Sequence, residues 1–165
     1  MSTLFVDNIS SKTGTSQAMT IDSGGRVVMP KRVHIRAVGD GTTGYHNNAA
    51  NEGLPMSVIE EDGDGNGASY YNTSTGLFTA PVGGVYLAGF TVLIATATTA
   101  TFVLQKNGSL YNRFYHSSQR GWHGSTSVLL SAGDTLKFVQ SLDSLDVYTG
   151  SGANQYTHIF FTHLG

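Results

Sequence analysis

The sequence contains no cysteine and few charged residues. Its 165 residues include 9 basic and 11 acidic side chains, or 12% of the chain, against roughly 25% in ordinary soluble domains. The absence of cysteine excludes a disulfide framework, a thiol nucleophile and a thiolate zinc site, while leaving either redox compartment open. The net charge of −2 and the scattered basic residues argue against a nucleic-acid partner. Because 39% of the residues are apolar, the chain can build a core and is not expected to be disordered.

Long apolar runs are also absent. The most membrane-like window, residues 85–104, contains repeated threonine together with valine and phenylalanine, a composition that favours β-strands over a helix. We interpret this window as two strands joined near residues 96–99 and expect no membrane span. Residues 1–10 lack the basic and apolar regions of a secretory signal.

No segment shows the 3.6-residue apolar period of an amphipathic helix, whereas alternation with a period of two recurs. Val33, Ile35 and Ala37 alternate with polar residues, and the run 100–104 alternates in the same way. Asn107-Gly108 then forms a strong hairpin signal, because both central residues of a type I′ turn need positive φ. About ten short strands with frequent turns predict an all-β antiparallel sandwich or barrel.

Other strands are expected where apolar and β-branched residues are bounded by turn residues. The strand at 85–94 has apolar residues on both faces, so we expect it to be buried on both sides. Residues 39–53 are rich in glycine and asparagine and are interpreted as a long loop, a kind of segment that is often functional. A tight turn is expected at residues 132–134. The remaining expected strands are 78–82, 110–115, 125–130, 135–141, 145–149 and 155–163.

Motifs that carry catalysis are missing. The sequence has no G-x-S-x-G elbow, no phosphate-binding or dinucleotide fingerprint and no histidine pair with the spacing of helical zinc ligands. The acidic residues lie mostly in turns and suggest no acid–base set. We therefore expect that the chain is not an enzyme. Its histidines are interpreted as surface or interface residues: His34, His46, His116, His123, His158 and His163.

One acidic segment, residues 60–67, stands out in this low-charge chain. Asp62, Asp64 and Asn66 fit the first half of a calcium loop, D-x-D-x-N-G, in which alternating oxygens surround the ion. The glutamate expected at the twelfth position is replaced by Thr73. No cofactor is therefore expected. Two interpretations stay open for the segment: a calcium site completed by other residues, and a solvated turn.

An aromatic cluster spans residues 110–122. Its rings and polar side chains are compatible with a glycan-binding surface. Aromatic residues at strand spacing are more often part of a core, so we favour a strand pair with core-facing rings and a polar loop.

Four motifs in order resemble the C1q/TNF-like jelly roll. Residues 71–86 (YNTSTGLFTAPVGGVY) are similar to the turn and first core strands of that family. Residues 104–108 (LQKNG) resemble its hairpin and residues 129–136 (LLSAGDTL) its glycine–aspartate turn. Residues 158–164 (HIFFTHL) resemble its last strand. The resemblance extends from about residue 33 to the C-terminus.

This resemblance implies a homotrimeric antiparallel jelly-roll sandwich, with the chain itself as partner. Surplus apolar surface on a low-charge domain is typical of an obligate interface. We divide the chain into an extended N-terminal arm, residues 1–32, and a C1q-like knob, residues 33–165. The residues predicted to form the core and the trimer interface are Phe78, Tyr86, Phe90, Phe138 and Phe160.

The arm carries a second resemblance. Residues 3–9 (TLFVDNI), Thr13-Gly14 and residues 25–30 (GRVVMP) are similar to the N-terminal segment of virion proteins of tailed bacteriophages. The arm has too little apolar material for a core of its own. The residues expected to anchor it to a virion are Leu4, Phe5, Val6, Ile9, Ile21, Val27 and Val28.

The two resemblances together suggest a structural protein of a phage virion. We expect a capsid decoration (cement) protein, assembled in the host cytoplasm and located on the virion surface, whose arm binds the major capsid protein or another virion protein. Three weak contacts in one trimer add up to tight attachment. An alternative is a receptor-binding tail-fibre tip or adhesin that recognises a host glycan. A third possibility is a C1q/TNF-like ligand outside viruses.

Overall fold

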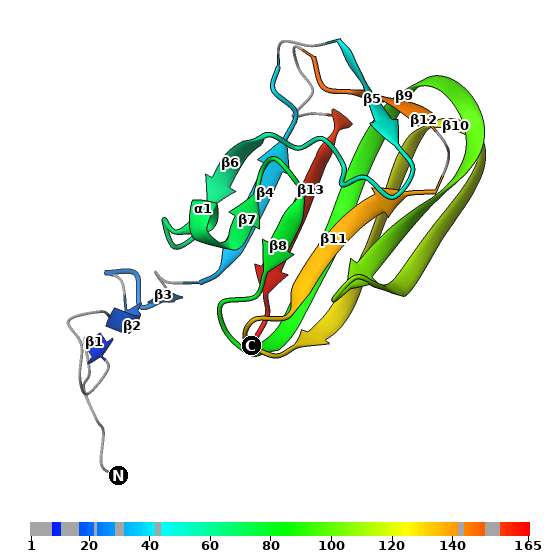
Figure 1. Ribbon diagram of the computed structural model, residues 1–165. Helices are drawn as coiled ribbons and strands as arrows, with labels where there is room; N and C mark the ends of the chain where they lie inside the picture. The colour runs from blue at the N-terminus through cyan, green and yellow to red at the C-terminus, as the bar shows by residue number, and fades with distance from the viewer. Residues whose placement is uncertain are drawn as a thin grey trace.

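The β-strands of the computed structural model form a two-layer sandwich with a separate small sheet near the N-terminus (Figure 1). The structure describes residues 8–10, 17–21, 23–28, 32–41, 44–141, 144–150 and 156–165. The strands are β1 (Asn8–Ser10), β2 (Gln17–Ile21), β3 (Val27–Val28), β4 (His34–Val38), β5 (Tyr45–Ala49), β6 (Val58–Asp62), β7 (Tyr71–Asn72), β8 (Leu77–Thr79), β9 (Gly84–Lys106), β10 (Ser109–Leu130), β11 (Thr135–Gln140), β12 (Ser144–Tyr148) and β13 (His158–His163). A single helical turn, α1 (Gly67–Tyr70), lies between β6 and β7.

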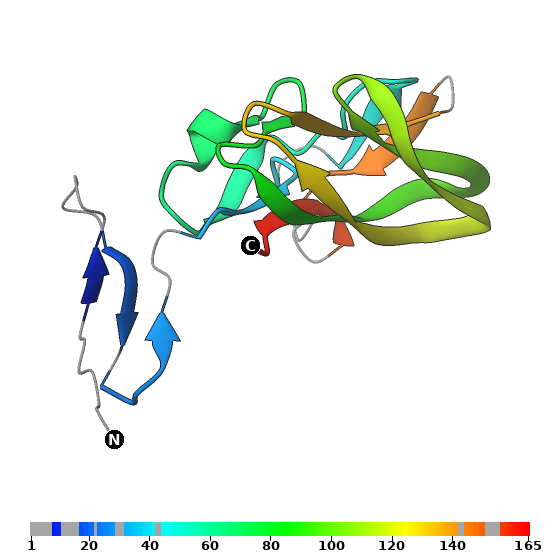
Figure 2. The same cartoon turned by 90° about the horizontal axis from the view of Figure 1, so that it is seen from below.

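Two antiparallel sheets make up the sandwich. Sheet 1 has the order β6-β4-β13-β9, with the second half of β10 paired to the first half of β9. Sheet 2 has the order β7-β8-β11-β9, with the first half of β10 paired to the second half of β9. Both long strands therefore pass from one layer into the other. Figure 2 shows the two layers and the N-terminal strands lying to one side of them. The predicted all-β antiparallel jelly roll is confirmed.

The continuity of β9 and β10 corrects the sequence analysis. The expected break at residues 96–99 does not occur, because the Ala/Thr segment there has no turn residue and stays extended. The strands expected at 110–115 and 125–130 are likewise joined in β10. Register shifts between His116 and Gly121, where Ser118 adopts a φ of 53°, allow β10 to bend between the sheets.

The two predicted turns are present, and they are linked to each other. Asn107 and Gly108 have φ of 51° and 75°, as a type I′ hairpin requires. Asn107 donates from Nδ2 to Asp134 in the second turn (2.8 Å), and Lys106 pairs with the same carboxylate at 3.0 Å. Asp134 also accepts from the backbone N–H of Ser131. These hydrogen bonds, led by that from Asn107, lower the pKa of Asp134 from 3.8 to about 2.

Residues 39–53 were expected to be a loop, but they contain β5. This strand pairs with β12 from Tyr45 opposite Tyr148 to Ala49 opposite Ser144. Its histidine and asparagines have low intrinsic strand preference. Pairing with β12 and burial of Asn48 determine its conformation instead.

The core lies between the sheets and is mainly aromatic. Phe161 of β13 stacks on Phe78 of β8, with ring centroids 4.5 Å apart. Phe102 of β9 meets Trp122 of β10 edge-on at 5.1 Å. Trp122 is fully buried and donates from Nε1 to the carbonyl of Gln119. Fully burying a side chain of this kind contributes about 2 kcal/mol or more, so these cross-sheet contacts account for much of the stability of the sandwich.

The small N-terminal sheet has the order β1-β2-β3, and its strands pair only with one another among the described residues. Ile21 is 49% exposed. Ile9, Val27 and Val28 lie on its strands, but only their backbone is described. Leu4, Phe5 and Val6 lie outside the described residues. No helix in the described part of the chain is long and apolar enough to span a membrane.

Candidate functional site

The surface of sheet 1 that points away from the core is the candidate site, and we call it the outward face. Side chains alternate along each strand, so those next to buried residues point outward. In β13 the buried residues are Ile159 and Phe161, which places Phe160 on the outward face. Pairing aligns Phe160 with Arg36 on one side and with Gly89 on the other. The other outward residues of β9 and β10 are Val85, Leu87, Thr91, Leu93, His123, Ser125, Ser127 and Leu129.

The outward face is apolar near the end of the molecule where β9 begins. Val85 pairs directly with Leu129, and these side chains are 37% and 68% exposed. The inner side of residues 85–94 is thus buried in the core. Part of their outer side is exposed to solvent in a single chain. Leucine and valine at these exposures are costly in water, so the patch is suited to contact with another protein.

Charged and polar side chains line the opposite border of the outward face. Arg36 forms ion pairs with Glu60 and, at 3.7 Å, with Glu61. His34 contacts the Glu61 carboxylate at 3.1 Å through Nε2 and Thr162 at 2.7 Å through Nδ1. This polar border beside an apolar centre is the usual arrangement of a protein–protein interface.

His158 lies on β13 between Val38 of β4 and Thr91 of β9, two residues along the strand from Phe160. Its Nδ1 is buried and has no hydrogen-bond partner among the described residues. Burial, and then the positive charge of Arg36, lower the pKa of His158, while Glu61 opposes the change. Burying a polar atom without a partner is unfavourable. A neighbouring subunit on the outward face could supply that partner.

The five residues predicted for the core and trimer interface fall into two places. Phe78, Tyr86, Phe90 and Phe138 are buried between the sheets, where they contact one another or Phe161. Phe160 alone lies on the outward face. Burial also raises the pKa of the Tyr86 hydroxyl, which donates to the carbonyl of Val82 at 2.9 Å.

The acidic loop forms its own hydrogen-bond network. Asp62 accepts from the backbone N–H groups of Gly65 (2.9 Å) and Gly67 (2.7 Å). Asp64 accepts from the N–H of Asn66 and from the hydroxyl of Tyr70, each at 3.0 Å. The described residues contain no group of three or more His, Asp or Glu that could hold a metal ion. The hydrogen bonds of the loop are complete without an ion; of the two interpretations, they favour the turn, and the calcium site stays an untested alternative.

The cluster at residues 110–122 is divided between core and surface. Trp122 is buried and Phe114 packs against the core, as expected for a strand pair. Leu110, Tyr111 and Tyr115 are exposed, with Tyr115 accessible over 68% of its surface. The preferred interpretation of core-facing rings therefore holds for only part of the cluster.

A comparison with protein-family models identifies the family to which this fold belongs. The sequence model of the C1q domain matches residues 46–162, more than half of the chain. The chain belongs to the C1q domain family. Domains of this family are binding and structural modules without enzymatic activity, in agreement with the expectation from sequence, and they typically assemble as homotrimers.

Solved structures support the fold. Murine APRIL superposes with a TM-score of 0.61 at 14% identity, covering 81% of this chain and 100% of that one. The Eiger TNF protein of S. frugiperda gives 0.59 at 13% identity, with coverage of 82% and 94%. The globular domain of zebrafish complement 1qA gives 0.57 at 12%, with coverage of 81% and 98%. No curated protein sequence matches the chain significantly. Identities this low establish the jelly roll and nothing about ligands.

Sequence reasoning missed most of the outward face. Leu87, Leu93 and Leu129 were not named as interface residues, although the apolar character of 85–94 on both faces was the signal. Strand pairing was needed to place Leu129 beside Val85, because the two residues are distant in sequence.

Proposed function

We propose that the chain forms a homotrimer through the outward face of sheet 1. The observation that supports this most directly is the exposed apolar pair Val85 and Leu129; Phe160 lies farther along the same face, opposite Gly89. Trimer formation would cover these side chains and would bring a second subunit close to Nδ1 of His158, which has no hydrogen-bond partner in the part of the chain that the structure describes. The typical assembly of the family points in the same direction.

The trimer would serve as a structural protein on a phage virion, as a capsid decoration (cement) protein. In this proposal residues 1–32 anchor the trimer to the capsid and residues 33–165 are displayed outside. The separate pairing of β1, β2 and β3 is compatible with an arm that binds elsewhere. The phage context itself is based on the resemblance of residues 3–9 and 25–30 to virion segments.

The experiment compares the full chain with a variant that lacks residues 1–32. The full chain should co-sediment with empty capsids of the phage that encodes it, and the shortened chain should not, although it remains trimeric. Antibodies against the knob should label the capsid of intact particles in electron micrographs. Capsid binding by the shortened chain would contradict anchoring by the arm, and label confined to tail fibres would contradict the cement function.

A tail-fibre tip or adhesin that binds a host glycan is the second candidate. It is supported by a different observation, a polar pocket between β5 and the loops that face it. Under this alternative the isolated knob binds host cells, which a cement protein need not do.

A further inference from the structure

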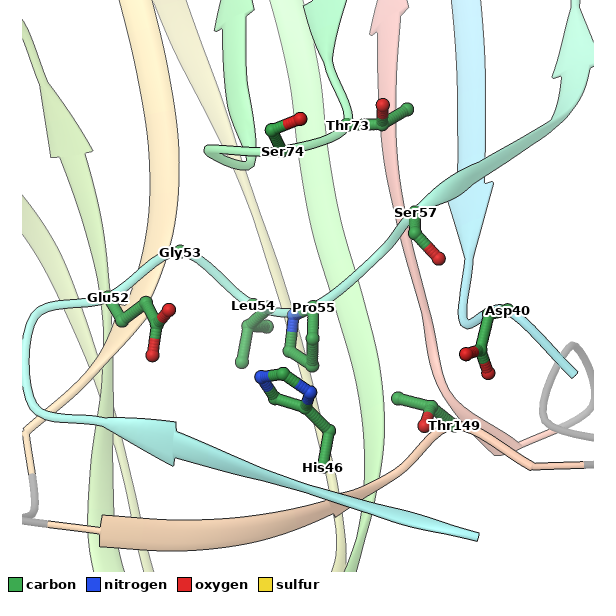
Figure 3. Close-up of a pocket in the computed structure, with 10 residues that line it drawn as sticks. All are labelled: Asp40, His46, Glu52, Gly53, Leu54, Pro55, Ser57, Thr73, Ser74 and Thr149. Atoms are coloured by element: carbon green, nitrogen blue, oxygen red, sulfur yellow. The ribbon is translucent and has the colours of Figure 1, made fainter. Parts of the chain in front are cut away.

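The pocket lies on the side of β5 that faces the segment between β5 and β6 (Figure 3). Its volume is about 220 Å³. Its polar walls are formed by the side chains of Asp40, His46, Glu52, Ser57, Ser74 and Thr149.

Backbone contacts hold the walls in place. The N–H of Gly41 donates to the carbonyl of Thr149 at 2.8 Å, and a side chain at Gly39 would overlap the backbone of Thr149. These contacts fix Asp40 beside Thr149. On the facing wall, Asn72 Oδ1 accepts from the N–H of Ser74 at 2.9 Å. A pocket with walls held in this way is largely formed before a ligand arrives, which reduces the cost of binding.

The Glu52 wall is fixed as well. The N–H of Ala49 donates to Glu52 Oε2 at 2.9 Å, and the N–H of Glu52 donates to the carbonyl of Ala49 at 3.2 Å. The N–H of Ala49 therefore holds the Glu52 carboxylate through one oxygen, Oε2, and does not use the other oxygen, Oε1.

The chemistry of the lining favours hydroxyl-bearing ligands. Ser57, Ser74 and Thr149 each carry a hydroxyl that can donate and accept, the two carboxylates accept, and His46 can do either. Pro55 adds apolar surface beside the imidazole (Figure 3), whereas the side chain of Leu54 is buried in the core. An apolar patch surrounded by alternating donors and acceptors matches a sugar ring, which has C–H faces and hydroxyl edges.

The arrangement disfavours other small ligands. Two carboxylates repel phosphates and acidic sugars. Glu52 and Asp40 lie on opposite sides of His46 rather than converging on one point (Figure 3), and no metal-holding group of three occurs among the described residues. The volume exceeds the roughly 150 Å³ of a cavity that accepts benzene, so a six-membered ring with its substituents fits.

We propose that this pocket binds one neutral monosaccharide unit, with Asp40 and Glu52 accepting hydrogen bonds from its hydroxyls. The proposal is independent of the cement function; it specifies the ligand class of the second candidate function, the glycan-binding protein, and rests on that candidate.

Saturation-transfer NMR on the full chain tests the proposal, with methyl glycosides of neutral hexoses and N-acetylhexosamines as probes. At least one glycoside should bind. Hydrogen bonds to charged groups are strong enough that Asp40→Asn or Glu52→Gln should weaken this binding by about tenfold. Glu52→Gln keeps an oxygen for the Ala49 N–H, so the loop should retain its fold. Ser74→Tyr, a substitution in an exposed turn, should fill the pocket and abolish binding.

Asp146→Asn is the matched control, because Asp146 is an exposed carboxylate on β12 that does not line the pocket. It should leave the affinity unchanged, and melting temperatures report whether each variant is folded. The proposal is overturned if no glycoside shows saturation transfer, or if binding survives Ser74→Tyr. Binding of arginine methyl ester in place of glycosides would also overturn it, because the pocket would then be a cation site.

Discussion

The ring of Phe160 lies against the backbone of Gly89 on the neighbouring strand. A methyl group at position 89 would overlap ring carbons Cζ and Cε1 of Phe160. The two residues are paired in register between β13 and β9, at the centre of the outward face. Glycine is therefore needed here for close approach of an aromatic ring, and the flat position of that ring helps to define the surface that we propose for trimer contact.

Replacing Gly89 with alanine should weaken the trimer. The methyl group would push the Phe160 ring away from the sheet and into the space of the neighbouring subunit. We expect the dissociation constant to rise by about tenfold or more, as overpacking commonly costs 1–3 kcal/mol. Analytical ultracentrifugation over a range of concentrations measures the change.

Gly121→Ala is the control for this substitution. Gly121 also lies on sheet 1, and a Cβ there would meet no atom within 4 Å. Equal dissociation of the two variants would mean that the Phe160–Gly89 contact does not matter for assembly.

Leu129→Glu should convert the trimer to monomers. It would place a charge in the centre of an apolar contact, and burying an unpaired charge costs several kcal/mol, or on the order of 100-fold in affinity. Leu110→Glu changes another exposed leucine, on sheet 2 and outside the outward face, and should remain trimeric. Light scattering distinguishes the two; a trimeric Leu129→Glu variant would place the interface elsewhere.

Acidification should destabilise the protein through His158. Its pKa in the folded chain is lowered below the ordinary value of 6.5 by burial and by Arg36. As the pH falls through 6.5, the unfolded chain takes up a proton that the folded chain does not, and stability decreases. Calorimetry between about pH 7.5 and about pH 5.5 should show a smaller loss of melting temperature for His158→Asn than for the original chain. The exposed His123, changed to Asn, is the control; identical pH profiles of the original chain and His158→Asn would contradict this account.

The acidic loop should be stabilised by its own hydrogen bonds. Asp62→Ala removes the acceptor of the Gly65 and Gly67 N–H groups and should lower the melting temperature with or without calcium. Asp62→Asn, which keeps one acceptor oxygen, should cost less. The original chain should melt at the same temperature in calcium and in a chelator. A drop in chelator that calcium reverses would instead support an ion site completed by residues outside the loop.

Local chemistry explains which parts of the fold could be predicted. The Asn107-Gly108 turn follows from two residues that tolerate positive φ, and the alternation of Ile35 and Ala37 with polar residues gives β4. The path of β9 could not be predicted, because both of its halves form strands and only pairing with β13 and β11 separates the layers. The strand β5 was missed because its polar residues depend on pairing with β12.

The candidate sites depend even more on tertiary structure. The pocket joins residues as distant as Asp40, Ser74 and Thr149, and no sequence spacing indicates that they meet. The composition of 39–53 gave only a general indication of function. The outward face needs the register of β9 with β10 and β13, although the apolar pattern of 85–94 pointed to a surface beyond the core.

The mass of the full-length chain in solution tests the central claim most directly. Native mass spectrometry or multi-angle light scattering at micromolar concentration should give three times the 17.5 kDa of one chain. The outward face of sheet 1 should then show reduced hydrogen exchange in the trimer, compared with the Leu129→Glu variant. A monomeric mass, or protection confined to sheet 2, would contradict the account.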